Sequence, residues 1–171
     1  HPRTIKGLLE GDKKALKNKP VKSFVELLDA INKQIDLKSY DTISGNAMHA
    51  EVESLLITNK HFKELQWLKQ FNLSTTEKIF LLLLVAEAMD NIDVSSLPEL
   101  INKAAVTKQE AYQFQNYLIT GISALLLHDL IEIEPNQFMQ CELGSISRRC
   151  YNQFFHEGNL LRKKAFHTRV S

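Results

Sequence analysis

Four copies of one short motif constrain the fold of this chain more than any other feature. In each copy a Ser or Thr is followed three residues later by Glu, directly before residues with helical apolar spacing. The hydroxyl accepts an amide N–H that the first helical turn leaves free, and the carboxylate favours the positive end of the helix. The motifs therefore predict four helix starts. They pair Ser23 with Glu26, Ser74 with Glu77, Ser96 with Glu99, and Thr107 with Glu110.

The spacing of apolar residues predicts how far the first helices run. Residues 24–35 carry one apolar stripe, and residues 79–89 are almost continuously apolar. Between them, residues 47–71 are expected to be helical with a break near residues 58–59. A loop over residues 37–46 is expected to precede that helix, because it is rich in turn-forming residues.

The helix that begins after Thr107 is expected to be long. It keeps three-to-four apolar spacing as far as Leu126, which predicts a core-facing stripe that includes Ile122. Gly121 lies inside this stretch, and a glycine in a helix interior costs about 1 kcal/mol relative to Ala. We therefore expect Gly121 either to permit close packing or to mark a bend.

After that helix the pattern changes from helical to alternating, which indicates strands. Residues 130–134 are expected to form one strand, a turn follows at Pro135 and Asn136, and residues 137–143 return. Gly144 and Ser145 are expected to end the second strand, before a final helix over about residues 146–156. The chain is thus predicted to be mainly α, with a helical N-terminal part followed by a winged-helix-like unit with one β-hairpin. The alternative is an all-helical bundle with an incidental hairpin.

The net charge of +1 conceals an uneven distribution. Residues 1–22 hold seven basic and two acidic residues, and residues 148–171 hold six basic and one acidic. The middle of the chain, residues 23–147, holds eight basic and seventeen acidic residues. The chain thus has an acidic body with two basic ends. This distribution excludes the class of uniformly basic proteins that bind polyanions. The ends are either solvated linkers or segments that dock on an acidic surface, on nucleic acid or on the body itself. The expected divisions are a basic N-terminal segment (1–22), a helical subdomain (23–71), a winged-helix-like domain (72–157) and a basic exit linker (158–171).

Composition and chain start indicate the class and compartment. The apolar fraction of 44% is that of a globular chain. The longest apolar run, residues 79–86, is too short to span a membrane. The chain starts at His1 and carries no secretory signal, so we expect a cytoplasmic piece of a longer protein. Cys141 and Cys150 are too few for a disulfide framework or a zinc site.

No motif for catalysis, cofactor or metal binding stands in the sequence. There is no G-x-x-x-x-G-K-[ST] loop for phosphate, no G-x-S-x-G turn for a nucleophile and no H-E-x-x-H pair for zinc. We therefore expect no catalytic, cofactor-binding or metal-ligating residue in this chain. A small helical enzyme remains the alternative that a deep pocket with convergent ionisable groups would favour.

The third helix and the hairpin give a candidate interaction surface. Winged helices that read DNA need cations on the outer face of the third helix, because phosphate neutralisation supplies much of the affinity. Here Lys108 is the only cation among the outward positions, and the hairpin adds carboxylates that would repel phosphate. A protein partner therefore fits this surface better than nucleic acid does. The surface consists of Gln109, Gln113, Asn116, Glu132 and Glu134.

Three short segments carry a resemblance to a known family. They are residues 73–77 (LSTTE) with 81–86 (LLLLVA), 125–133 (LLLHDLIEI) and 143–147 (LGSIS). They resemble the winged-helix region that precedes the ATPase module in some bacterial AAA+ ATPases, including those encoded with contractile injection systems. The resemblance covers roughly residues 73–156 and implies an ATPase module further along the parent chain.

These observations lead to one expected function and one alternative. We expect a non-catalytic N-terminal protein-interaction or regulatory module of a larger AAA+ ATPase, which recruits a partner or substrate protein. No membrane contact is expected, and oligomerisation through the parent chain stays open. The alternative is a nucleic-acid-binding winged helix that uses its basic ends.

Overall fold

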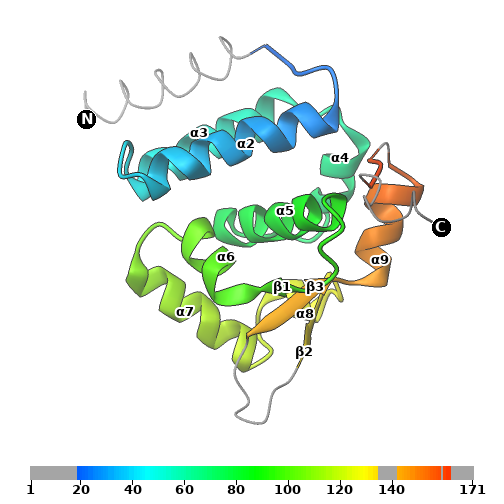
Figure 1. Ribbon diagram of the computed structural model, residues 1–171. Coiled ribbons are helices and arrows are strands. Elements are labelled where there is room, and N and C mark those ends of the chain that lie inside the picture. The colour runs from blue at the N-terminus through cyan, green and yellow to red at the C-terminus, as the bar shows by residue number, and fades with distance from the viewer. Residues whose placement is uncertain (1–18, 135–141, 159, 163–171) are drawn as a thin grey trace, which may run out of the picture.

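The almost continuously apolar run forms the central helix of the fold. The computed structural model describes residues 19–134, 142–158 and 160–162. Its central helix α5 (Thr75–Met89) has ten buried residues out of fifteen. A helix that is apolar on all sides needs neighbours on all sides, and the other elements are arranged around it (Figure 1). The result is a mainly helical fold, as the sequence predicts, with a small three-stranded antiparallel sheet that contains the predicted hairpin strand β2 (Ile131–Glu134).

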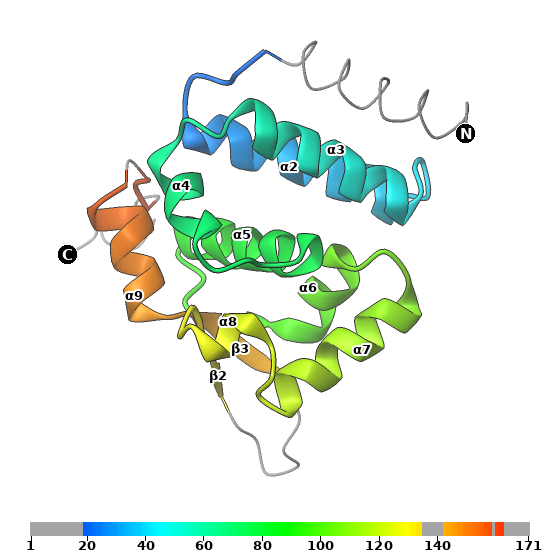
Figure 2. The ribbon, with the colours of Figure 1, turned by 180° about the vertical axis from the view of Figure 1, so that it is seen from behind.

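Helix pairs and the sheet cover opposite sides of α5. Helices α2 (Phe24–Ser39) and α3 (Gly45–Thr58) pack side by side on one side of it. Helix α6 (Leu97–Ala104) and the sheet contact it from the other side (Figures 1 and 2). The break expected near residues 58–59 is confirmed, because α4 (Lys63–Lys69) begins only after a turn. The loop expected over residues 37–46 is shorter than predicted.

Three of the four predicted helix caps are confirmed. Ser74 forms a complete capping box with its Glu, while Ser23 and Thr107 each accept an amide N–H from the third helical residue. The cap expected at Ser96 is wrong: α6 begins after it, but the Ser96 side chain makes no capping hydrogen bond. Pro98 occupies one of the two helical positions whose N–H a cap usually binds, and it has none to donate.

The sheet contains one strand that the sequence pattern did not predict. Its order is β1 (Ser95–Ser96), β3 (Leu143–Ile146) and β2 (Ile131–Glu134), with both pairings antiparallel. Strand β2 lies where alternation predicts it. The short β1 has no alternating pattern and forms because its backbone pairs with β3. The predicted turn at Pro135 and Asn136 lies outside the described residues.

The return strand is displaced from its predicted position. Gly144 and Ser145 lie inside β3 and pair with β2, so the prediction that they end the strand is wrong. A Cβ at Gly144 would lie 2.7 Å from the carbonyl oxygen of Glu132 and 2.9 Å from a methyl carbon of Leu97. Glycine is therefore what lets β3 approach both neighbours. Residues 137–141, the start of the predicted strand, lie outside the described residues.

The predicted long helix after Thr107 ends early. Helix α7 (Lys108–Ile119) is followed by a turn and by the short α8 (Ala124–Leu127). Gly121 has φ 76°, and its N–H donates to the carbonyl of Leu118 while the N–H of Ile122 donates to that of Tyr117. This is a Schellman termination, which favours glycine. Gly121 therefore neither bends the helix nor permits close packing, since no atom lies within 4 Å of an added Cβ.

The C-terminal part closes the core. Ile146 lies in β3, so the final helix begins later than predicted, at α9 (Arg148–Tyr151), and continues as a π-helical turn, η1 (Asn152–His156). One buried apolar cluster includes residues from Phe24 to Leu160. It joins the helices of residues 23–71 to the elements that follow them. No helix among the described residues is long and apolar enough to cross a membrane. Residues 1–18 and 163–171, which hold five of the seven basic residues of the N-terminal end and three of the six of the C-terminal end, lie outside the described part.

Candidate functional site

Helix α7 has a buried face and an exposed face. Ala111, Phe114 and Leu118 are buried, and the Phe114 ring lies 5.2 Å from that of Phe80 in α5. This contact fixes the helix against the core and directs its opposite face to solvent (Figure 1). The three predicted surface residues on this helix are all exposed there. They are Gln109, Gln113 and Asn116.

The exposed face of α7 also carries apolar side chains that the sequence reasoning missed. Tyr112 is 67% exposed and Tyr117 48%. Five of the eleven large exposed apolar side chains among the described residues lie between residues 112 and 127. Tyrosine is enriched in protein interfaces because it combines a large apolar area with a polar group. These five are Tyr112, Tyr117, Ile119, Ile122 and Leu127.

Ile122 shows why part of this surface was missed. The predicted continuous helix places it on the core-facing stripe, but the turn at Gly121 leaves its side chain 59% exposed. That prediction is therefore wrong. The signal that could have corrected it is the glycine itself, which sits where a helix C-terminus commonly needs a residue with positive φ.

The outer face of α7 carries almost no charge. The helix holds one basic residue, Lys108, and one acidic residue, Glu110. The Glu110 carboxylate turns toward α5, at the side of α7: its Oε1 accepts from the Thr76 hydroxyl and, at 3.2 Å, from the amide N–H of Val106. The remaining outward side chains are amides, tyrosines and apolar groups.

The other predicted surface residues lie on an edge strand. Glu132 and Glu134 are exposed on β2, which has only one neighbour in the described sheet, β3. Glu142, just before β3, is exposed as well. The structure thus leaves three carboxylates on this hairpin free to face solvent. It does not bring Glu132 or Glu134 into the groove described next.

A groove of about 560 Å³ lies beside α7, between the first turn of α5 and the first turn of α8. Its apolar lining includes Phe114, Tyr117 and Ile122, and Gln113 lies at its side. Hereafter this is the α7–α8 groove. The groove places the predicted surface residue Gln113 next to Tyr117 and Ile122, two exposed apolar side chains that the sequence did not predict.

One carboxylate holds two helix starts together at this groove. Glu77 Oε1 accepts the amide N–H of Ser74 at 3.0 Å, which completes the cap of α5. Its Oε2 accepts the Ser123 hydroxyl at 2.8 Å and the amide N–H of Ala124 at 3.0 Å, in the first turn of α8. Glu77 therefore fixes the position of the loop that carries Ile122. The groove has a rigid wall on this side.

A second groove, of about 690 Å³, lies on the other side of α7 against α6 and the end of α2. Its charged groups are of mixed sign and include Lys38, Asp41 and Glu99. Lys38 Nζ donates to the carbonyl of Asn102 at 2.6 Å, and partial burial lowers the pKa of Lys38. The Glu110 carboxylate opposes that shift. This lysine serves to join α2 to α6.

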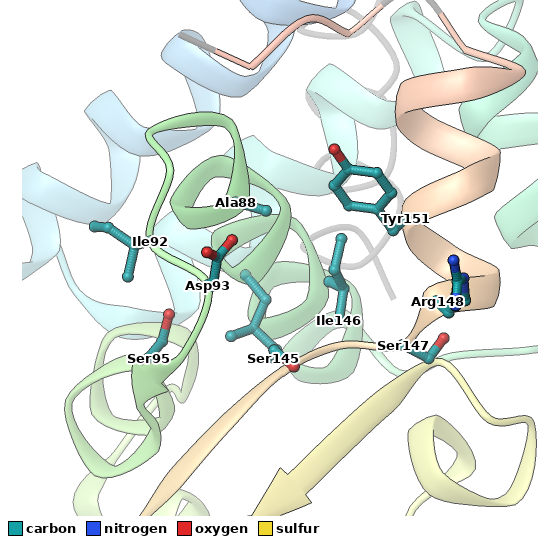
Figure 3. Close-up of a pocket in the computed structure, with 10 residues that line it drawn as sticks. Ala88, Ile92, Asp93, Ser95, Ser145, Ile146, Ser147, Arg148 and Tyr151 are labelled. Atoms are coloured by element: carbon teal, nitrogen blue, oxygen red, sulfur yellow. The ribbon is translucent and has the colours of Figure 1, made fainter. Parts of the chain in front are cut away.

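A third pocket, of about 190 Å³, lies where α5 ends against β3 and α9 (Figure 3). Asp93 and Tyr151 enter it from different elements. Arg162 joins the two: a guanidinium nitrogen lies 2.6 Å from Asp93 Oδ1, and its carbon lies 5.9 Å from the Tyr151 ring centroid. The pocket is smaller than the ~300 Å³ of the smallest common ligand sites.

Cys150 and its neighbour Arg149 are engaged in contacts that hold the fold together. Cys150 is buried, and burial raises the pKa of its thiol although the Arg149 charge opposes the shift. Arg149 itself covers Phe71 at 5.1 Å and donates to the carbonyl of His128. Within the described residues no group of three or more His, Cys, Asp or Glu side chains could hold a metal ion. Cys141 lies outside the described part.

Comparison of the chain with protein-family models, with curated proteins and with solved structures gave no match.

Proposed function

We propose that this chain is a protein-interaction module built on a winged helix, with the outer face of α7 as its main contact. The order of elements supports this assignment: α5, β1, α6, α7, the short α8, β2 and β3 follow one another, and the sheet order is β1, β3, β2. In that arrangement α7 takes the place of the helix that enters the major groove in DNA-reading members.

The composition of the α7 face carries the proposal. DNA binding of this kind needs several Lys and Arg contacts to phosphate. The outer face offers Lys108 alone, together with amides and tyrosines, and the neighbouring hairpin offers exposed carboxylates. Protein interfaces are rich in tyrosine and poor in charge at their centre. A protein partner is thus the better match.

We further propose that the module is a non-catalytic N-terminal regulatory part of a larger bacterial AAA+ ATPase and acts in the cytoplasm. The three segments of the sequence resemblance fall on α5, on α8 with β2, and on β3, which are elements of the same unit. A G-x-x-x-x-G-K-[ST] motif in the parent chain beyond Ser171 would support this context. A parent chain without one would contradict it.

Site-specific photo-crosslinking tests the interaction surface. A photoreactive amino acid in place of Asn116 on α7 should crosslink to one defined protein in the cells from which the chain comes. The same amino acid in place of Lys33 on α2 should give no such crosslink. Both positions are exposed, so the pair differs only in location. Equal crosslinking from both positions, or none from Asn116, would contradict the proposal.

Nucleic-acid binding is tested separately by electrophoretic mobility shift of the full chain. We expect no shift at low micromolar protein. Tight binding that weakens by about a thousandfold or more between 50 mM and 200 mM salt would indicate many phosphate contacts. That result would favour the alternative in which the basic ends bind nucleic acid.

A further inference from the structure

We infer that the α7–α8 groove binds a short partner segment in which a large apolar side chain stands near a Lys or Arg. The inference rests on the proposed function and names the chemistry of the partner. It is carried by the shape of the groove, by its apolar lining and by the sign of the charges in it.

The lining explains the apolar half of the recognised segment. Phe114 is held in place by its contact with Phe80, while Tyr117 and Ile122 are 48% and 59% exposed. Tyr117 and Ile122 are also joined through the backbone, since the Ile122 N–H donates to the Tyr117 carbonyl at 3.0 Å. A volume of about 560 Å³ lies within the range of ~300–1,000 Å³ that is common for ligand sites. One aromatic or large aliphatic side chain would cover this apolar area.

The charges explain the basic half. Among the residues that the structure describes, Glu77 and Glu110 are the charged ones that line the groove, and no Lys, Arg or His lines it. Both hydrogen bonds described above for Glu110 fall on Oε1, and a carboxylate can accept about four. A partner carboxylate would meet like charge here, whereas a Lys or Arg would gain charge-assisted hydrogen bonds.

The wider surface favours the same partner. The described residues include thirteen Lys and Arg against eighteen Asp and Glu, so the body attracts basic segments over longer distances. The groove differs in this respect from the one between α6 and α7, whose lysines and carboxylates are mixed. Charge complementarity therefore selects the α7–α8 groove and the sign of its partner together.

Two matched peptides test the inference by NMR on the ¹⁵N-labelled full chain. One is acetylated and amidated Phe-Ala-Ala-Lys, and the other carries Glu in place of the Lys. The Lys peptide should shift the groove amides and bind about tenfold tighter than the Glu peptide at low salt. Equal binding of the two peptides, or shifts confined to other surfaces, would overturn the inference. The groove amides to follow are those of Gln113, Phe114, Tyr117, Ser123 and Ala124.

A pair of variants separates the groove from general apolar attraction. Ile122→Ser removes an exposed side chain of the lining, and Ile57→Ser removes one of similar exposure (56%) on α3. The first should weaken the Lys peptide about tenfold, while the second should leave its affinity unchanged. Equal effects would overturn the inference. Both variants should melt like the parent, because neither side chain belongs to the core.

The peptide experiment and the crosslinking experiment test the two proposals separately. If Asn116 captured a partner but the Lys peptide left the groove unshifted, the groove chemistry would be wrong and the interaction module would stand. If the Lys peptide bound but no partner crosslinked to α7, the groove chemistry would stand and the proposed interaction surface would be wrong.

Discussion

Helices α5 and α7 begin with the same kind of motif and end up in opposite surroundings. Each has a hydroxyl cap and a Glu in its first turn, yet ten of fifteen residues are buried in α5 and three of twelve in α7. The cap therefore decides where a helix begins, and the apolar pattern after it decides what the helix does. In this fold α5 supplies the core, and α7 presents a surface that the core does not need.

The largest effect should come from truncating a buried ring of α5. Phe80 is fully buried and packs on Phe114. Phe80→Ala should lower the free energy of unfolding by about 3–5 kcal/mol, because it removes apolar contacts and leaves a cavity. Urea denaturation followed by circular dichroism measures this loss. Tyr112→Ala on α7 is the matched control and should change it by less than about 0.5 kcal/mol. Similar losses in both would mean that the outer face of α7 is packed as the core is.

A smaller effect is expected where the two helices are linked through Glu77. Glu77→Gln keeps the size of the side chain but turns one acceptor into a donor, and three donors now bind the carboxylate. The expected loss of unfolding free energy is about 1–3 kcal/mol. Glu132→Gln, on the exposed edge strand, should cost almost nothing.

A double-mutant cycle shows whether that loss passes through α8. Ser123→Ala removes the hydroxyl that donates to Glu77, so the double variant should lose less unfolding free energy than the sum of the two single losses. Strict additivity in urea denaturation would contradict a shared network. It would also remove the reason for a rigid wall in the α7–α8 groove.

The parts of the fold that sequence predicts are those that local chemistry determines. The caps at Ser23, Ser74 and Thr107 depend on residues within one turn, and the apolar run of α5 depends on solvent exclusion alone. The hairpin strand β2 follows from alternation. The helix start at Ser96 was predicted correctly, but its side-chain cap was not, because pairing of its backbone with β3 and the following Pro98 override the local motif.

The remaining errors arise from glycines whose role depends on distant neighbours. Gly144 resembles a strand end by sequence, but it lies within β3, where the close approach of Glu132 and Leu97 leaves no room for a Cβ. Gly121 resembles a helix defect, but it ends α7 and turns Ile122 outward. The predicted amide face of α7 was found, since its spacing is local. The groove beside it was not, because it needs three helix segments brought together.

An intermediate effect is expected from Gly121 itself. Gly121→Ala places a Cβ at φ 76°, which should cost about 1–2 kcal/mol of unfolding free energy. The same substitution inside a continuous helix would instead stabilise the protein by about 0.4–1 kcal/mol. The sign of the change in thermal unfolding therefore distinguishes the observed turn from the predicted long helix. Asn116→Ala, in the middle of α7, provides the helical reference.

Tyr112→Ala should have the smallest effect on stability and the largest effect on partner binding. Tyr112 is 67% exposed, so Tyr112→Ala should change the unfolding free energy by less than about 0.5 kcal/mol. The same change should remove most of the partner crosslink from Asn116, because exposed tyrosines at the centre of an interface often dominate its affinity. Tyr40→Ala, at the end of α2 and 82% exposed, should affect neither property. A Tyr112 variant that kept the crosslink would place the contact elsewhere, and one that unfolded the protein would show that α7 stabilises the fold as α5 does.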